Sequence, residues 1–521
     1  MNPIFERSLY AKLPLTQGTK SSIIKNKMSG TMRKSDRIVP LFYFILFERM
    51  RKMENIRQNK MSETPVKKLM ISMGVPMIIS MVLQAVYNIV DSAFVSNMQQ
   101  NGEAALNALT LAFPLQILMV AVGIGTGVGA NVLTAQSFGR KDSENANKAA
   151  GNAVFLALVI YIVFLLFGIF GAKSYIGSQT NNPLILAMGT DYLSICCIFS
   201  FGMSFFAVYE KLLQATGHSL YSTIAQIAGA VTNMILDPIL IYGLGVFPEM
   251  GVKGAAYATV IGQIVSFVLA LIFHIKVNKA FSNKLRYFVP SRKTIFQIYA
   301  VGLPAIISQA LISVMTYGLN VILGGIGENA VTAYGLFYKI QQFLLFAAFG
   351  MRDAIMPITA FSFGMGDRGR IKDCVKYGHI YTAVIMLFGF VLIEVLAVPF
   401  TGMFGLAGET SELCISAMRI ISFSFVFAGI NIAFQGIFQA IGGGIQSLII
   451  SVCRQALFIF PFAIWFAQIA KASHEKTYLM WFIFPIAEIL TAAVSIFMFV
   501  MVHKKRIAVM ENGIDDLHEK A

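Results

Sequence analysis

Polar side chains inside otherwise apolar segments are the first place where this chain could carry out chemistry. Gln84, Tyr87, Asn88 and Asp91 follow one another at the spacing i, i+3, i+4 and i+7. On a helix this spacing places all four on one face, because residues three and four apart stack on consecutive turns. A carboxylate within a membrane-length apolar helix is costly, so Asp91 predicts a functional site.

A second polar face is predicted in the apolar segment around residue 233. Gln226, Asn233 and Asp237 lie on one side of the expected helix, and Asn233 and Asp237 are one turn apart. Pro238 follows directly and removes a backbone donor, which disfavours a regular helix there. Carbonyl oxygens freed by such a bend could help to solvate a cation.

Asp91 and Asp237 are expected to face one cavity. Two carboxylates in a low-dielectric pocket can take up and release a proton near neutral pH, or hold Na⁺ together with amide and hydroxyl oxygens. The alternative is that each carboxylate caps a neighbouring helix or pairs with a cation. The two apolar segments that carry these acids contain no Lys or Arg, which favours the ion site.

Glu210 and Lys211 are adjacent near the predicted cytoplasmic end of another apolar segment. One interpretation is that the pair snorkels, with both charges in interfacial water and the side-chain stems on apolar surface. The other is that Glu210 is a third acid that handles protons.

The second half of the chain carries fewer acids and more cations within its apolar segments. Asp353 follows Arg352, and the two are candidates to neutralise each other, whereas Glu394 and Glu488 are expected to be isolated. This asymmetry predicts that ion coupling belongs to the first half. The candidates for the substrate path are Gln84, Gln226, Gln309, Tyr317, Asn320, Lys339 and Arg352.

The composition is that of a membrane protein. Of the 521 residues, 56% are hydrophobic and 13% are charged, and the mean hydropathy is +0.69, whereas soluble domains carry about a quarter charged residues. Twelve apolar segments follow from residue 69 onward, each longer than the ~20 residues that a bilayer core requires. They include the segments 184–213 and 412–440.

Three motifs recur in the same order in the two halves of the chain. They pair Gly74-Val75-Pro76 with Gly302-Leu303-Pro304, Ala135–Gly139 with Ala360–Gly364, and Gln214–Gly217 with Gln439–Gly442. The last two pairs share an offset of 225 residues. Halves of six spans each insert in the same orientation, so we expect an all-α fold of two six-helix bundles related by a pseudo-twofold axis along the membrane normal.

Positively charged loops predict the orientation and the organisation of the chain. Cations cluster in alternate loops, which places both termini in the cytoplasm of a multi-pass protein of the cell membrane. The expected parts are a basic, disordered extension (1–68), an N-terminal bundle (69–277), a cytoplasmic linker (278–294), a C-terminal bundle (295–503) and a cytoplasmic tail (504–521). Because Met61 directly precedes the first span, residues 1–60 are interpreted as an extension or as sequence upstream of the true start.

Several function classes are not indicated by the sequence. The glycines at 123, 125, 127 and 129 lack the Lys-Ser/Thr of a phosphate-binding loop and predict close helix packing. The five cysteines have no metal-binding spacing. The net charge of +15 predicts contact with anionic lipid rather than nucleic acid. We expect no enzyme activity, no cofactor and no ATP site, and a protein that works as a monomer.

In combination these motifs resemble the multidrug and toxic compound extrusion (MATE) transporters over about residues 65–505. The resemblance is carried by Gln84-x-x-Tyr87-Asn88-x-x-Asp91, Gln214-Ala215-Thr216-Gly217, Asn233-x-x-x-Asp237-Pro238 and the run from Gly251 to Thr259. It implies twelve helices in two bundles, and antiport in which H⁺ or Na⁺ enters while an organic cation leaves.

The resemblance also implies a site. Asp91 and Asp237 match the acids of the DinF-like branch, and Asn233 and Thr259 match its cation-site positions, with Tyr87 and Asn88 in the same motif. Where many members of that branch carry Asn, this sequence has Glu210, which bears on proton number or ion choice. The chain is thus predicted to be a secondary antiporter that exports multidrug-type cations by alternating access. The alternatives are a flippase for lipid-linked precursors of the same superfamily and a non-transporting membrane receptor.

Overall fold

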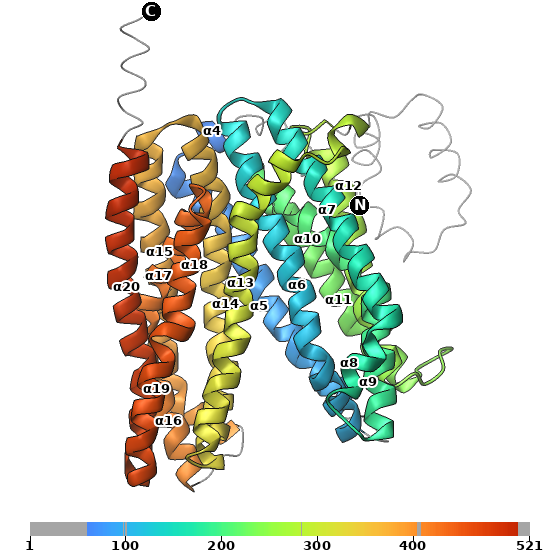
Figure 1. The fold of residues 1–521 in the computed structure, drawn as a ribbon, viewed down its shortest axis with the longest axis vertical. Helices are drawn as coiled ribbons and strands as arrows, with labels where there is room; N and C mark the ends of the chain where they lie inside the picture. Colours follow the sequence, from blue (N-terminus) through green and yellow to red (C-terminus); the bar gives the residue numbers. More distant parts are fainter. Residues whose placement is uncertain (1–59, 97, 99–101, 283, 404–407, 509–521) are drawn as a thin grey trace, which may run out of the picture. The chain divides into compact units, whose positions relative to one another are not determined.

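The computed structural model describes residues 60–96, 98, 102–282, 284–403 and 408–508, and it is almost entirely helical there (Figure 1). Residues 1–59 of the predicted extension and residues 509–521 of the predicted tail lie outside the described residues. So do the side chains of Tyr87, Asn88 and Asp91, although their backbone belongs to a described helix.

The first half forms an N-terminal bundle. After the short α4 (Lys60–Glu63), its helices are α5 (Val66–Ser96), α6 (Gly102–Gly139), α7 (Ser143–Phe170), α8 (Ala172–Gly177), α9 (Pro183–Ile198), α10 (Phe201–Ala215), α11 (Ser219–Tyr242) and α12 (Val252–Val277). A connecting segment with one 3₁₀ turn, η1 (Leu285–Phe288), leads to the second half.

The second half forms a C-terminal bundle beside the first (Figure 1). Its elements are α13 (Arg292–Gly324), α14 (Glu328–Met365), α15 (Arg368–Met403), α16 (Gly408–Ser422), α17 (Phe425–Ala440), α18 (Gly444–Val452), the π-helical η2 (Cys453–Leu457), α19 (Ile459–Ala472), the 3₁₀ segment η3 (His474–Phe482), α20 (Ile483–Val502) and the π-helical η4 (His503–Ile507).

The predicted spans 184–213 and 412–440 are each formed by two helices that meet at a bend. α9 and α10 meet at 47°, and α16 and α17 meet at 52°. At the breaks the backbone switches to shorter-range bonds, from Ser200 N to Cys197 O and from Ser424 N to Ile421 O. Among the described residues, ten helices are long and apolar enough to cross a membrane, and the two bent pairs raise that number to twelve.

The duplication extends to the geometry of the turns. Lys141 and Gly366, which are 225 residues apart, both have positive φ, at 60° and 72°. The residue after each is an aspartate that accepts a backbone hydrogen bond, Asp142 from Asn145 at 3.0 Å and Asp367 from Arg370 at 2.9 Å. At the loop residue Asp142, this bond holds the carboxyl pKa below its usual value.

The end of the predicted disordered extension, residues 60–68, is ordered in the described structure, and the first span begins at Val66 rather than residue 69. Met61 is buried. Arg370 donates to the carbonyl oxygens of Met61 at 2.7 Å and Thr64 at 3.2 Å. These bonds satisfy carbonyls that a helix end leaves without partners, which is why the segment folds.

Helix α6 of the N-terminal bundle packs against α13 of the C-terminal bundle, and its glycines allow this close approach. A Cβ atom on Gly125 would lie 2.8 Å from the carbonyl oxygen of Gly302, and one on Gly129 would lie 2.0 Å from that of Ile298, both on α13. Gly127 instead faces Ala207 of α10. The predicted close packing of this glycine run is therefore confirmed, and it brings backbone against backbone across the bundle interface.

A buried charge cluster, formed by Glu210, Lys211, Arg352 and Asp353, joins the same two bundles. Lys211 Nζ of α10 lies 2.7 Å from Asp353 Oδ2 of α14, and these side chains are 1% and 2% exposed. Arg352 binds the other oxygen of Asp353 at 2.8 Å, and Glu210 lies 3.6 Å from Lys211 Nζ. The snorkelling interpretation of Glu210 and Lys211 is wrong, because the partner that keeps Lys211 out of water comes from the other half of the chain.

Substituting Gly129 by Ala is expected to lower the stability of the purified protein by about 1–3 kcal/mol, because the added methyl group would press on the backbone of α13. Gly335→Ala is the matched control, since a Cβ at Gly335 meets nothing within 4 Å. Thermal unfolding in detergent would compare the two. Equal midpoints for both variants would mean that α6 and α13 are not in close contact in the protein.

Removing one partner of the Lys211–Asp353 pair is expected to cost about 3–5 kcal/mol, because the other charge stays buried without its closest partner. Lys211→Met and Asp353→Leu should each lower the unfolding midpoint strongly, and the double variant should recover much of the loss. Lys253→Met serves as control, since Lys253 pairs with Asp191 at the surface, where such pairs contribute about 0–1 kcal/mol. Additive losses in the double variant would contradict a direct pair.

Candidate functional site

Three of the predicted cation-site residues come together inside the N-terminal bundle. Asn233 Nδ2 donates to Asp237 Oδ1 at 3.2 Å within α11 and to Thr259 Oγ1 of α12 at 3.4 Å. Asp237 is fully buried, and Asn233 and Thr259 are nearly so. The Oδ1 atom of Asn233 is buried and accepts no hydrogen bond among the described residues. The cluster thus presents carboxylate, amide and hydroxyl oxygens, which are the ligands that hard cations prefer.

Small residues bring α11 and α12 close enough to form this cluster. A Cβ on Gly229 would lie 1.9 Å from Ser266 Oγ, and a Cβ on Gly262 would lie 2.7 Å from the carbonyl oxygen of Gly229. α11 continues as a helix through Pro238 to Tyr242. Because the proline lacks an N–H, the carbonyl of Met234 loses its usual hydrogen-bond donor, although the helix continues.

Helix α5 runs alongside α11 in the same direction. Near one end, Ser80 donates to Gln226, and Gln226 donates to Gln84. Near the other end, Tyr242 Oη donates to the carbonyl oxygen of Phe94 at 2.7 Å. The predicted path residues Gln84 and Gln226 are therefore in contact. These bonds flank position 91 on α5 and position 237 on α11, so the backbone of the two predicted acids lies at a similar level.

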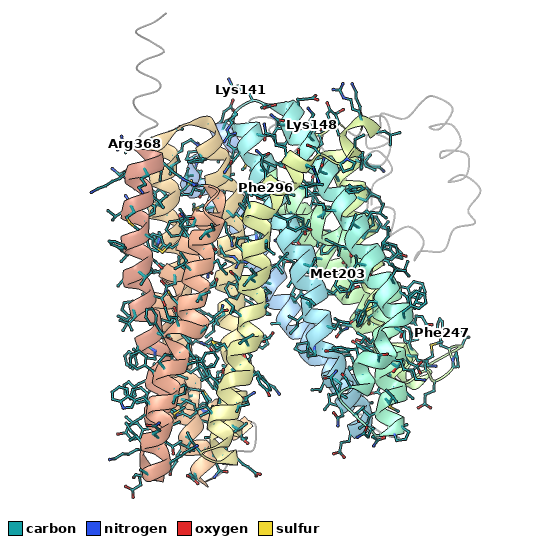
Figure 2. The ribbon with its side chains drawn as sticks, in the orientation of Figure 1. Lys141, Lys148, Met203, Phe247, Phe296 and Arg368 are labelled. Atoms are coloured by element: carbon teal, nitrogen blue, oxygen red, sulfur yellow. The ribbon has the colours of Figure 1, made fainter. Side chains whose placement is uncertain are left out.

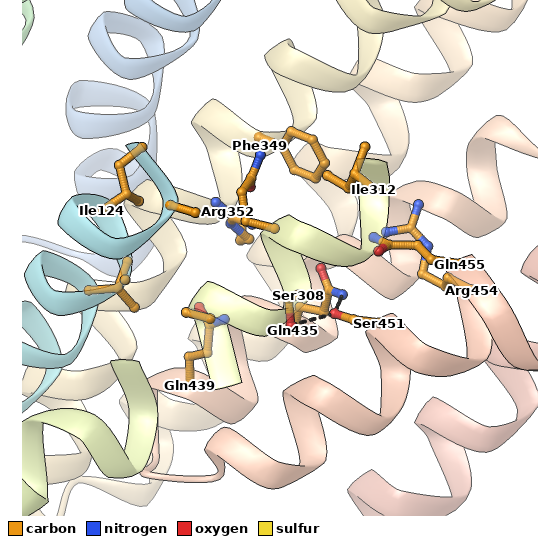
Figure 3. A pocket seen from close by; sticks show the side chains of 15 residues that line it. Ile124, Ser308, Ile312, Phe349, Arg352, Gln435, Gln439, Ser451, Arg454 and Gln455 are labelled. Atoms are coloured by element: carbon orange, nitrogen blue, oxygen red, sulfur yellow. Dashed lines mark hydrogen bonds between the residues drawn. The ribbon is translucent and has the colours of Figure 1, made fainter. Parts of the chain in front are cut away.

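A narrow pocket, partly open to solvent, lies between α6 and the C-terminal bundle. Its polar wall includes the predicted residues Gln309 and Arg352, and its other side includes Ile124 of α6 (Figure 3). Ser451 donates to Ser308 and accepts from Gln435, both at 2.8 Å, as the dashed lines in Figure 3 show. No carboxylate is among the described side chains that line this pocket.

Two residues at this pocket, Arg454 and Gln455, were not predicted to belong to the site. They lie on the π-helical turn η2, a local irregularity without a proline or glycine to signal it. Arg454 forms a bidentate ion pair with Glu488, with distances of 2.7 and 2.9 Å. The prediction that Glu488 is isolated is therefore wrong, and Glu394 also has a partner, since it accepts from Ser422 at 2.7 Å.

The remaining predicted path residues are not brought to the pocket. Tyr317 and Asn320 are exposed on α13, and Lys339 is exposed on α14. Glu210 belongs to the buried charge cluster and accepts from Gln214 at 2.7 Å. Arg352 takes part in both places, because it binds Asp353 of the cluster and also lines the pocket. The described structure therefore contains an acidic site in one bundle and a pocket lined by arginines beside the other.

Comparisons with known proteins agree with this fold. The MatE family model matches residues 76–239 and 304–465, one match in each half of the chain. The chain is 26% identical over 407 residues to the multidrug export protein MepA of Staphylococcus aureus (strain NCTC 8325 / PS 47), covering 76% of this chain and 86% of that protein.

Two solved structures are similar over most of the chain. One is the crystal structure of MATE in complex with MaL6, with a TM-score of 0.80 and 25% identity over 87% of this chain and 99% of that one. The other is an outward-facing conformation of a multidrug resistance MATE family transporter of the MOP superfamily, with a TM-score of 0.79 and 25% identity over 87% and 98%. The resemblance seen in the motifs is confirmed, and this chain belongs to the MatE family.

Proposed function

We propose that this protein is a secondary antiporter that exports organic cations in exchange for H⁺ or Na⁺. The observation that carries the proposal is the buried cluster of Asn233, Asp237 and Thr259. Burying a carboxylate inside a membrane protein is costly, so a buried carboxylate in a membrane-spanning helix indicates a functional role. The name of the similar MepA protein, a multidrug export protein, supports the choice of substrate class.

Several features support a coupling role for Asp237. The unused oxygen of Asn233 is a ready acceptor for a bound cation or for a protonated carboxyl group. α11 forms hydrogen bonds with α5 on both sides of the cluster. A change in the charge of Asp237 can therefore act on the helix that carries Asp91. Ion binding at this position can therefore change the packing of α5.

Alternating access requires the bundles to come apart and rejoin at one end. The Lys211–Asp353 pair holds them together where α10 meets α14, and it must open for the opposite conformation to form. Ion and substrate drive transport only if they prefer different conformations, since a ligand that binds both equally shifts nothing.

The charged loops support the proposed orientation. Figure 2 shows Lys141, Lys148 and Arg368 at one end of the described bundles and Phe247 toward the other. Loops rich in Lys and Arg stay in the cytoplasm, so the end that carries Lys141 is the cytoplasmic one in this proposal.

Efflux of a cationic dye from energised cells tests the proposal. Wild type should extrude the dye at a rate that depends on the H⁺ or Na⁺ gradient. At matched expression, the efflux rates of Asp237→Asn and Asp91→Asn should fall to the rate measured without a gradient. The reason is that a neutral amide lacks the negative charge with which the carboxylate binds H⁺ or Na⁺. Titrating pH against sodium then identifies the coupling ion.

Asp191→Asn is the matched control, because Asp191 is 43% exposed and pairs with Lys253 on the surface. It should pump like wild type. Full activity in Asp237→Asn would refute the coupling site, and the absence of any cation movement by wild type would favour the lipid-linked flippase instead.

A further inference from the structure

We propose that the pocket between α6 and the C-terminal bundle binds an anionic oxygen group, a carboxylate or a phosphate, carried by a substrate with an apolar body. The proposal goes beyond the proposed export of organic cations, and it rests on that function only in that the ligand is taken to be a compound transported by the same protein. It adds a recognition element of opposite charge to the acidic cluster around Asp237.

Two arginines line this pocket, and each has one guanidinium nitrogen that its acid partner does not use. Arg454 uses Nε and Nη2 for Glu488, and Arg352 uses Nε and Nη2 for Asp353. The remaining Nη1 atom of each has no hydrogen-bond partner among the described residues. Guanidinium N–H groups bind carboxylate and phosphate oxygens strongly, and more so away from bulk water.

The acids that balance these arginines lie behind them. Glu488 and Asp353 are the partners of Arg454 and Arg352, but neither belongs to the described side chains that line the pocket. A ligand in the pocket therefore meets the positive side of each ion pair. An organic cation alone would face two guanidinium groups and no carboxylate there, which disfavours its ammonium group at this position.

The polar side of the pocket that carries the two arginines is largely buried, although the side chain of Arg352 is 20% exposed. Arg454 and Gln455 are each 8% exposed. Gln455 Oε1 is buried and accepts no hydrogen bond among the described residues. A polar atom in that condition is costly unless a ligand or water completes it.

The opposite wall of the pocket indicates the chemistry of the rest of the ligand. Ala121, Ile124 and Val128 of α6 face the arginines across the pocket, and Phe349 and Ile312 add apolar surface from the C-terminal bundle. Phe349 also lies under the guanidinium of Arg352, with its ring centroid 4.9 Å from Cζ. The ligand that fits both walls is an amphiphile, with one anionic group and an aromatic or aliphatic body.

Equilibrium binding to the purified full-length protein, without any gradient, tests this subsite. The probe is dansylglycine, a fluorescent aromatic carboxylate, and its methyl ester is the neutral counterpart. Wild type should bind the acid about tenfold or more tightly than the ester, because a hydrogen bond to a charged group contributes more than one to a neutral group. Arg352→Gln should bring the two affinities together.

A double variant, Arg454→Gln with Glu488→Gln, tests the second arginine without leaving Glu488 buried and unpaired. It should also lose the preference for the acid, while Arg286→Gln, at a surface arginine that binds Glu144, should keep it. Equal affinity of wild type for acid and ester, or an unchanged preference in both pocket variants, would overturn the proposal.

Competition identifies the source of the anionic group. Displacement of dansylglycine by benzoylglycine but not by dodecyl phosphate assigns the subsite to soluble carboxylates, and the reverse assigns it to a lipid phosphate. Asp191→Asn, the control of the efflux experiment, should leave the acid preference intact. Failure of this subsite is thereby separated from failure of the cation-coupled export, since binding is measured without transport.

Discussion

The arrangement of the two bundles depends on one buried ion pair, between Lys211 of α10 and Asp353 of α14. Taking two charges out of water costs several kcal/mol per ion, and only close pairing with further hydrogen bonds offsets that cost. Here Arg352 and Glu210 supply the further partners. Such a contact tolerates little displacement, because a shift of a few ångströms leaves each charge buried without its partner. The pair therefore favours two distinct states, closed and fully separated, over a continuum between them.

The two halves are similar in backbone geometry and differ in the charges of their buried residues. Positive-φ turns recur at Lys141 and Gly366, and the breaks at Ser200 and Ser424 fall at nearly equivalent places. The residue 225 positions after the buried Asp237 is Phe462, which carries no charge. One half therefore contains the acidic cluster, and the other contains Arg352 and Arg454 at the pocket.

The helices and the polar residues at Asn233 and Asp237 could be predicted from the sequence, because long apolar runs and helical spacing are local properties. Asn233 and Thr259 were linked only through family resemblance, since spacing alone does not join two helices. The partner of Lys211 could not be predicted, because Asp353 lies 142 residues away and only packing brings it near. The breaks at Ser200 and Ser424 and the π turn before Phe458 contain no proline or glycine themselves, although Gly202 and Pro461 follow within a few residues, so their exact positions could not be predicted.

Arg352 connects the pocket to the contact that holds the bundles together. Its guanidinium binds Asp353, which also binds Lys211, and the same side chain lines the pocket. When the guanidinium of Arg352 binds Asp353 and a ligand together, its attraction to each of them is weaker than its attraction would be to that partner alone. A ligand at Arg352 therefore changes the electrostatic balance of the Lys211–Asp353 pair without touching Lys211. In the proposed mechanism, the bundle that carries Asp237 contributes Lys211 to that pair, so the acidic cluster and the pocket would both act on the same interface. Coupling between them needs no direct contact, because each has only to favour a different state of that interface.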